Sequence, residues 1–430
     1  MKIEEIYEIY KNASAVTTDT RKIISGAIFF ALKGDKFDGN KYAKEAINKG
    51  CKFAIVDDKT VVNSKSFILV DNVLSCLQQL AKYHRQQLNI PIIAITGTNG
   101  KTTTKELISS VLIKKYKIGS TQGNFNNHIG VPLTLLSFNK ETEIGIVEMG
   151  ANHPLEIKEL CQIALPNYGI ITNIGKAHIE GFGSFENIIK TKRELFDFIK
   201  ISNGKVFYNS TNKLLQEAVN DLELDTIAFG KKDSSVRGEI LPSNKYLKLN
   251  LSIGNSTENV TTQLIGNYNL ENILAAACIG NYFRVSNLNI ISAIQEYKPQ
   301  NNRSEFIQTT SNNLYLDAYN ANPTSVKAAL DNFISLNLNN KVVILGDMLE
   351  LGIESKKEHE KIIKFISLQD FKRILLVGRI YSSLETPDSI TTFDNINELI
   401  TWIESNKIYN SNVLVKGSRG IQLEQIVDNL

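Results

Sequence analysis

Short apolar runs alternate with amphipathic segments along most of this chain. The runs typical of buried strands lie at residues 28–32, 53–56, 67–70, 92–95, 144–150, 168–175, 342–346, 374–378 and 412–417. Segments 42–49 and 73–88 have the apolar spacing of helices. Strands and helices that alternate in this way predict an α/β fold with mostly parallel sheets.

The chain has 430 residues, which is too long for one hydrophobic core. The pattern predicts a small α/β domain at 1–84, a central domain at 85–300 and a C-terminal domain at 301–430. We expect a mostly parallel sheet in the central domain and a doubly wound, Rossmann-like sheet in the last. Alternation in segment 245–266, with a Gly254-Asn255 turn, predicts an antiparallel hairpin.

Composition argues against several classes of protein. A net charge of +3 is too small to indicate binding to nucleic acid or an anionic membrane. The cysteines are scattered, so they spell neither a disulfide framework nor a zinc site. The sequence has no apolar run of 18 residues and no apolar core of a signal peptide at its start. We expect a soluble cytoplasmic monomer with no nucleic-acid partner and no membrane insertion.

A glycine loop joins the strand ending at Ile95 to a helical segment. Gly97 and Gly100 let the backbone turn tightly and bring N–H groups toward a ligand. The helix start adds free N–H donors and the positive end of a dipole, which together suit a phosphate. Lys101 would reach the outer phosphates and Thr102 would bind Mg²⁺, although Ile95 stands where the Walker A pattern has its first glycine. The alternative is an ordinary glycine-rich turn with a solvated lysine.

Three more residues are candidates for chemistry. Glu148 stands at the end of a strand, where an acid could hold Mg²⁺ beside the phosphate loop, or it is a solvated glutamate. His178 follows another strand, and a lone histidine is often structural. Lys192 lies within the apolar stripe of helix 186–199, so it either reaches the surface with its charged end or has a lowered pKa and takes part in chemistry. Because no nucleophile motif is present, the chemistry should come from a bound nucleotide.

Polar loops mark two further regions. Loops 17–22 and 32–40 are conspicuous in the first domain, where α/β folds often bind ligands, although plain surface turns are the alternative. In segment 317–330, Asn322 is expected as the N-cap of a helix with Pro323 at its first position.

Together these motifs resemble the Mur ligase family, in order and over essentially the whole chain. The segments that carry the resemblance are TDTRK (18–22), ALKGDKFDG (31–39), GTNGKT (97–102), GNFNNHIGVPLTLL (123–136), VEMGANHPLEI (147–157), TNIGKAHIEGFGSFENIIKTKRELF (172–196), GNYNLENILAA (266–276), DAYNANPTSVKAAL (317–330), LGDMLELG (345–352) and LVKGSR (414–419). The resemblance implies an ATP-dependent ligase that adds D-alanyl-D-alanine to UDP-N-acetylmuramoyl-tripeptide through an acyl phosphate, giving a peptidoglycan precursor.

The resemblance also implies a role for each matching residue. Those implied to bind ATP are Gly97, Thr98, Asn99, Gly100, Lys101, Thr102, Thr103, Asn269, Asn272, Arg303 and Asp317. Two Mg²⁺ ions are implied, the first on Thr102 and Glu148 and the second on His178 and a carbamylated Lys192. Lys101, Glu148, His178 and Lys192 would be the catalytic set. The residues implied to hold UDP are Asp19, Arg21, Lys33, Gly34 and Asp38, and Asn320 and Asn322 are candidates for the dipeptide.

Four positions depart from the common family pattern, namely Asn40, Tyr268, Asn302 and Leu316. Other readings also stay open. The chain could be another amide ligase of the same architecture, such as a folylpolyglutamate synthase or a Mur ligase that adds one amino acid. A nucleotide-gated binding protein and an inactive scaffold are further alternatives. The identity of the third, diamino residue of the tripeptide is not readable from the sequence.

Overall fold

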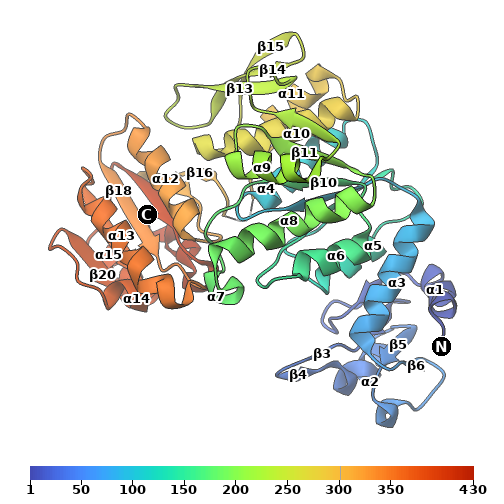
Figure 1. Ribbon diagram of the computed structural model, residues 1–430. Coiled ribbons are helices and arrows are strands. Elements are labelled where there is room, and N and C mark those ends of the chain that lie inside the picture. The colour runs from blue at the N-terminus through green and yellow to red at the C-terminus, as the bar shows by residue number, and fades with distance from the viewer. Residues whose placement is uncertain (301) are drawn as a thin grey trace.

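The computed structural model describes residues 1–300 and 302–430, which form three α/β units, each around its own sheet (Figure 1). The N-terminal and C-terminal units lie on opposite sides of the central unit. The α/β class with mostly parallel sheets is therefore confirmed. Residue 301, the predicted start of the third domain, lies outside the described residues, and both domain boundaries stay predictions.

The N-terminal unit has a parallel sheet of order β1-β2-β5-β6. Its strands are β1 (Val16–Thr17), β2 (Ile28–Phe30), β5 (Phe53–Val56) and β6 (Phe67–Leu69), with a separate ribbon of β3 (Lys33–Gly34) and β4 (Phe37–Asp38). Its helices are α1 (Ile3–Lys11), η1 (Gly39–Tyr42), α2 (Ala43–Asn48), η2 (Lys59–Val61) and α3 (Val73–Leu88). The helix predicted at 73–88 is confirmed, and the one predicted at 42–49 is a 3₁₀ turn followed by α2.

The central sheet is parallel throughout, with the order β12-β11-β10-β7-β9-β8. Its strands are β7 (Ile92–Thr96), β8 (Ile118–Ser120), β9 (Ile144–Glu148), β10 (Tyr168–Ile171), β11 (Lys205–Asn209) and β12 (Thr226–Phe229). Its helices are α4 (Lys101–Leu112), α5 (Gly130–Leu136), α6 (Glu156–Ala164), α7 (Ile179–Phe182), α8 (Phe185–Ile201), α9 (Lys213–Leu222), η3 (Asn267–Asn269), α10 (Leu270–Tyr282) and α11 (Asn287–Glu296).

Both faces of this sheet are covered, as its apolar runs require. Ile93 and Ile95 of β7 pack in one core with α4 and α10, whereas Ile92 and Ala94 pack in another with α6 and α8. The predicted hairpin is confirmed as β14 (Lys248–Ile253) and β15 (Ser256–Thr261), and β13 (Val236–Leu241) adds a third strand that was not predicted.

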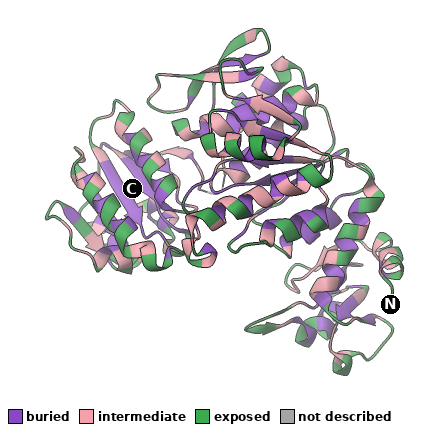
Figure 2. Ribbon diagram, in the orientation of Figure 1, coloured by how far each residue is buried: buried purple, intermediate pink, exposed green. Residues whose placement is uncertain are grey.

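The C-terminal unit has a doubly wound sheet of order β16-β17-β21-β18-β19-β20, in which only the edge strand β16 is antiparallel among the described residues. Its strands are β16 (Glu305–Gln308), β17 (Asn312–Leu316), β18 (Lys341–Gly346), β19 (Arg373–Val377), β20 (Ile390–Phe393) and β21 (Ser411–Lys416). Its helices are α12 (Pro323–Ser335), η4 (Gly352–Glu354), α13 (Ser355–Ser367), α14 (Arg379–Ser382), α15 (Ile396–Ser405), η5 (Arg419–Ile421) and η6 (Leu423–Asn429). Figure 2 shows that buried residues are concentrated in the strands of this sheet.

The cap predicted for α12 is confirmed, since the Asn322 side chain accepts a hydrogen bond from the Ser325 N–H and Pro323 is the first helical residue. Among the described residues, no helix combines the length and the apolar character that crossing a membrane requires.

Candidate active site

A cavity of about 920 Å³ lies where the carboxyl ends of β7, β9 and β10 meet the C-terminal unit. Its volume is at the upper end of the range for small-molecule sites. The predicted site residues that line it are Thr98, Asn99, Gly100, Lys101, Thr102, Thr103, Glu148, His178, Asn269, Asn272, Arg303, Asp317 and Asn320. Those that do not line it are Gly97, Lys192, Asn322, Asp19, Arg21, Lys33, Gly34 and Asp38.

Two glycines and a lysine stabilise the conformation of the phosphate loop. Gly97 and Gly100 have φ angles of 140° and 78°, and a Cβ on Gly97 would lie 2.0 Å from the hydroxyl of Thr172. The Lys101 ammonium donates to the carbonyls of Gly97 and Thr98 at 2.8 and 3.0 Å. Burial lowers the pKa of Lys101, and the nearby Glu148 carboxylate opposes that effect. The N–H groups of Thr98 and Asn99 donate to Asn173 at 2.9 and 3.0 Å, so the donors that could face a phosphate are those at the start of α4.

Glu148 has one satisfied and one unsatisfied carboxylate oxygen. Thr102 and Asn126 donate to Oε1 at 3.2 and 2.8 Å, whereas Oε2 is buried and has no partner among the described residues. A buried carboxylate oxygen without a partner is costly, and a hard cation such as Mg²⁺ would satisfy it. Asn126 lies in the motif GNFNNHIGVPLTLL, and nothing in that motif predicted a role for it. Its contact with Glu148 places it in the site.

Lys192 does not reach the surface. It lies on α8 with 3% of its surface exposed, and its ammonium is 5.4 Å from the centre of the Phe182 ring. Burial, and after it the positive charge of Lys101, lowers the pKa of Lys192 from 10.5 to about 7. The side chain is thus poised to be neutral near pH 7, as a group used in chemistry would be.

His178 meets the C-terminal unit at the edge of the cavity. It has a left-handed φ of 51° just before α7, and its Nδ1 atom is in ion-pair contact with the carboxylate of Glu350. Across residues 1–300 and 302–430, no three His, Cys, Asp or Glu side chains are grouped to hold one metal ion. A metal here would therefore need other donors, such as the Thr102 hydroxyl or phosphate oxygens.

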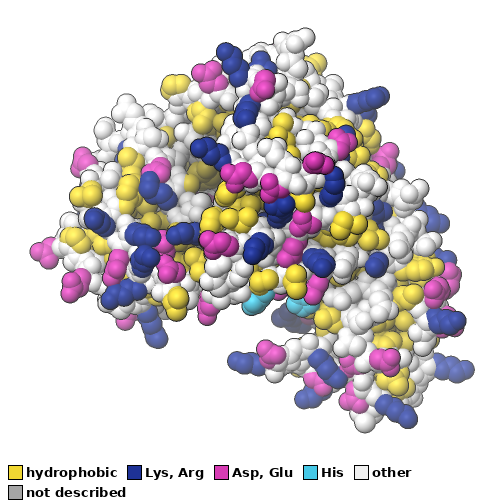
Figure 3. Space-filling view, viewed as in Figure 1, with side chains coloured by type: hydrophobic (Ala, Val, Ile, Leu, Met, Phe, Trp, Pro, Cys, Tyr) yellow, Lys and Arg dark blue, Asp and Glu magenta, His cyan; other side chains and the backbone are white. Residues whose placement is uncertain are grey.

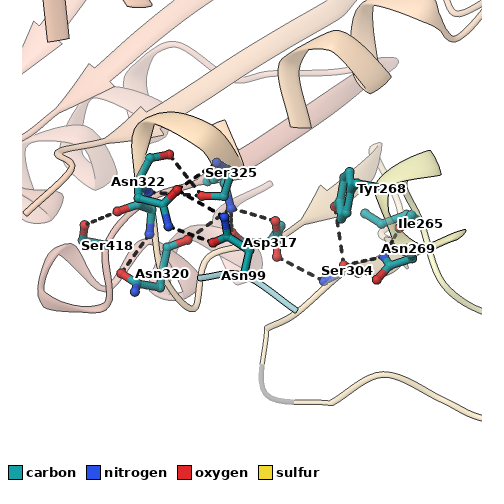
Figure 4. Close-up of polar contacts among 12 residues, drawn as sticks. Asn99, Ile265, Tyr268, Asn269, Ser304, Asp317, Asn320, Asn322, Ser325 and Ser418 are labelled. Carbon is teal, nitrogen blue, oxygen red and sulfur yellow. Dashed lines mark hydrogen bonds and ion pairs between the residues drawn. The ribbon is translucent and has the colours of Figure 1, made fainter. Parts of the chain in front are cut away.

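Three of the residues predicted on the nucleotide side, Asn269, Asn272 and Asp317, belong to one hydrogen-bonded network, and Figure 4 shows its Asn269, Ser304 and Asp317 members. Asn272 donates to Asn269 at 2.8 Å, and Asn269 donates to Ser304 at 3.0 Å. Asp317 accepts from the Ser304 N–H at 3.4 Å and forms an ion pair of 2.7 Å with the buried Lys416. These contacts link the central unit to the start of the C-terminal unit.

Two asparagines join the phosphate loop directly to the C-terminal unit. Asn322 donates to Asn99 at 2.8 Å while its side-chain oxygen caps α12 (Figure 4). Arg303 stacks on the ring of Tyr319, with its guanidinium carbon 3.4 Å from the ring centre. The phosphate loop and the C-terminal unit are therefore in direct contact.

The predicted UDP-binding residues belong to the N-terminal unit and have local partners. Arg21 forms an ion pair with Asp19, and Lys33 forms one with Asp57, each at 2.8 Å. Asp38 accepts from the backbone N–H of Asn40 at 3.0 Å. Figure 3 shows that this unit projects from the rest of the molecule beside an open hollow, with histidine side chains (cyan) at the rim of the central unit.

Comparison with known proteins covers almost the whole chain. Residues 12–93 match the family model "Mur ligase family, catalytic domain", residues 95–280 match "Mur ligase middle domain" and residues 302–419 match "Mur ligase, glutamate ligase domain". The UDP-N-acetylmuramoyl-tripeptide--D-alanyl-D-alanine ligase of Bacillus subtilis is 34% identical over 427 residues, which cover 96% of this chain and 92% of the relative.

Solved structures agree with this result. A MurF crystal structure from Acinetobacter baumannii has a TM-score of 0.89 and 29% identity, and the match covers 100% of this chain and 98% of that one. A MurF ligase from Thermotoga maritima in complex with ADP has a TM-score of 0.86 and 25% identity, with the same coverage.

Proposed function

This chain belongs to the Mur ligase family, and we propose that it is the ATP-dependent ligase that joins D-alanyl-D-alanine to UDP-N-acetylmuramoyl-tripeptide. The products are the UDP-muramoyl-pentapeptide precursor of peptidoglycan, ADP and phosphate. The observation that carries the proposal is one cavity in which the phosphate loop faces Glu148 and the C-terminal unit, in a chain similar along its length to a ligase of that name. Because the Bacillus subtilis relative is named for adding D-alanyl-D-alanine, we favour this reaction over the addition of glutamate or of a single amino acid.

The first step transfers the γ-phosphoryl group of ATP to the terminal carboxylate of the tripeptide. The N–H groups of the phosphate loop hold the phosphates, and Lys101 neutralises negative charge as it develops on the transferred group. Asn269, Asn272, Arg303 and Asp317 hold the rest of the nucleotide. ADP leaves, and the tripeptide becomes an acyl phosphate.

In the second step the amine of the dipeptide attacks the acyl carbon. The tetrahedral intermediate collapses when its bond to the phosphate oxygen breaks, the amine loses a proton and phosphate departs. The contacts between Asn99 and Asn322 and between His178 and Glu350 hold the C-terminal unit against the cavity. Such docking excludes water that would otherwise hydrolyse the acyl phosphate. We assign Asn320 and Asn322 to the dipeptide, and Asp19, Arg21, Lys33, Gly34 and Asp38 to the UDP end.

Two Mg²⁺ ions form part of the proposal. When bound, they would neutralise phosphate oxygens and polarise the acyl group. Thr102 and Glu148 would hold the first ion, which the unpartnered Oε2 of Glu148 supports. His178 and a carbamylated Lys192 would hold the second. Carbamylation requires a neutral amine, which a pKa of about 7 for Lys192 supplies.

We propose further that the enzyme is a cytoplasmic monomer and that its domains are residues 1–84, 85–300 and 301–430. Lys and Arg are interspersed with Asp and Glu on the face in Figure 3, which supports the absence of a nucleic-acid or membrane partner.

The test follows the phosphate. With UDP-N-acetylmuramoyl-tripeptide carrying ¹⁸O in its terminal carboxylate, ATP and D-alanyl-D-alanine, we expect one ¹⁸O in each released phosphate. Lys101→Met should release almost none. Phosphate release that needs no dipeptide, or released phosphate without ¹⁸O, would contradict the proposed ligase chemistry.

A further inference from the structure

The C-terminal unit contacts the central unit through two ion pairs beside the cavity. Glu350, between β18 and η4, meets Nδ1 of His178. Glu358 on α13 meets the Lys176 ammonium at 3.3 Å. Both basic partners come from the segment that follows β10, so one loop of the central unit supplies both of these ion-pair partners.

The backbone around Glu350 is built for this contact. Glu350 has a left-handed φ of 65°, a conformation that is unfavourable for a residue other than glycine. Its carbonyl accepts the N–H of Glu180 at 3.4 Å, and a Cβ on Gly352 would lie 3.2 Å from the Glu180 side chain. Because the unfavourable conformation of Glu350 occurs where it contacts the central unit, we infer that this contact has a function.

The contact also distinguishes the two ring nitrogens of His178. Nδ1 is buried, and the Glu350 carboxylate is in ion-pair contact with it, although no group among the described residues meets it with hydrogen-bond geometry. His178 itself lines the cavity, and no hydrogen bond to its Nε2 is found in the described parts of the chain. Histidines that bind a metal through one nitrogen usually donate from the other to a carboxylate, which fixes the tautomer and the ring orientation.

We propose that Glu350 is the outer partner of His178 in the second metal site, so that this site is complete only when the C-terminal unit is docked. Glu350 is a positioning residue in this account, because it would act on the metal through the imidazole. Since coupling between two binding events is reciprocal, occupation of the second site would in turn favour docking. The inference rests on the proposed function, which supplies the second metal.

Metal binding tests the inference without turnover. Mn²⁺ replaces Mg²⁺, and electron paramagnetic resonance counts bound Mn²⁺ on the whole protein with a non-hydrolysable ATP analogue and UDP-N-acetylmuramoyl-tripeptide. The wild type should bind two ions. Glu350→Gln should weaken the second ion about 10- to 100-fold, the usual effect of losing a ligand's outer partner, and leave the first unchanged.

Two control variants separate this role from general loss of docking. Glu354→Gln is four positions further along, at the end of η4, and the ion-pair partner of Glu354 among the described residues is Lys357, so both ions should bind as in the wild type. Glu358→Gln removes the other ion pair between the units and should weaken the second ion much less than Glu350→Gln does.

Three results would overturn the inference. They are unchanged binding of the second ion by Glu350→Gln, an equal loss in Glu358→Gln, and a wild type that binds one ion. The pair would then be an exposed ion pair of little energetic value, since the Glu350 side chain is 56% exposed. Wild-type turnover with D-alanyl-D-alanine is scored separately, so failure of the inference and failure of the proposed function remain distinguishable.

Discussion

Replacing Lys192 with methionine should make the ligand-free protein more stable while it abolishes turnover. Methionine has a similar length and flexibility and no charge to desolvate. At about 1.4 kcal/mol per pKa unit, the fall from 10.5 to about 7 corresponds to on the order of 5 kcal/mol, which is a ceiling on the cost of burying the ammonium. Because relaxation offsets part of that cost, we expect a gain in the free energy of unfolding of about 1–3 kcal/mol near pH 6.

The pH dependence gives this prediction its sign. The pKa of Lys192 is lower in the folded chain, so the unfolded chain binds more protons between pH 7 and 10.5. The cost is therefore fully present below pH 7 and is relieved as the pH rises toward 10.5. The advantage of Lys192→Met should be largest near pH 6 and should shrink toward pH 10.

Turnover, unlike stability, should depend on the Lys192 amine and should be lost in Lys192→Met. With a pKa of about 7, half of the Lys192 amines are neutral at pH 7, against roughly one in 3,000 for an ordinary lysine. The neutral amine is the form that reacts with CO₂, so wild-type activity should fall in CO₂-free buffer and recover with bicarbonate. Lys192→Met should be inactive under both conditions.

Urea unfolding followed by circular dichroism at pH 6 and pH 9, together with phosphate release, measures both effects. Lys190→Met on the exposed side of the same helix is the matched control and should change neither. A Lys192→Met protein that is less stable than the wild type at pH 6, or that keeps full turnover, would refute this account of the buried lysine.

Two other variants test parts of the site, and a third tests a buried histidine outside it. Gly97→Ala should lose ATP binding in calorimetric titration and about 1–3 kcal/mol of stability, because its φ is 140° and a Cβ would lie 2.0 Å from a threonine hydroxyl. Gly34 has open space around it, so Gly34→Ala should keep the melting temperature of the wild type. Asn322→Ala should lower the free energy of unfolding by about 1 kcal/mol, because the cap of α12 is lost, and should also raise the KM for ATP. Asn395→Ala removes the cap of α15 and should show the loss of stability alone. If the two variants have the same KM for ATP, the contact of Asn322 with the phosphate loop has no role in binding ATP. Burial lowers the pKa of His84, so the stability that its neutral form supports is present above pH 6.5 and is lost as the pH falls through the lowered pKa. In His84→Gln the melting temperature should therefore change less between pH 7 and pH 5 than in the wild type. The same change in both proteins would show that His84 does not cause this pH dependence.

The sequence predicted the parts of the fold that depend on local pattern. Residues 73–88 and 53–56 form the predicted helix and strand because their apolar spacing matches the faces they bury. Lys192 was identifiable in the same way, since a charge within an apolar stripe is visible from spacing alone.

Other features of the fold and the site depend on contacts between segments far apart in the sequence. The spacing of apolar residues along the chain does not predict such contacts. The strand β16 pairs with β17 at the edge of the sheet, and its short run has no distinctive pattern. Glu350 meets His178, 172 positions away along the chain, only because two sheets are docked. Asn126 approaches Glu148 because β8 lies beside β9, an order that loop composition does not specify.

The most direct test of the central claim is a competition among amines. The enzyme is given UDP-N-acetylmuramoyl-tripeptide, ATP and Mg²⁺ with equal concentrations of D-alanyl-D-alanine, D-alanine and glutamate, and the products are weighed by mass spectrometry. We expect one product, heavier than the tripeptide substrate by the mass of D-alanyl-D-alanine less one water. A product that carries D-alanine or glutamate alone would keep the ligase chemistry but contradict the assigned reaction.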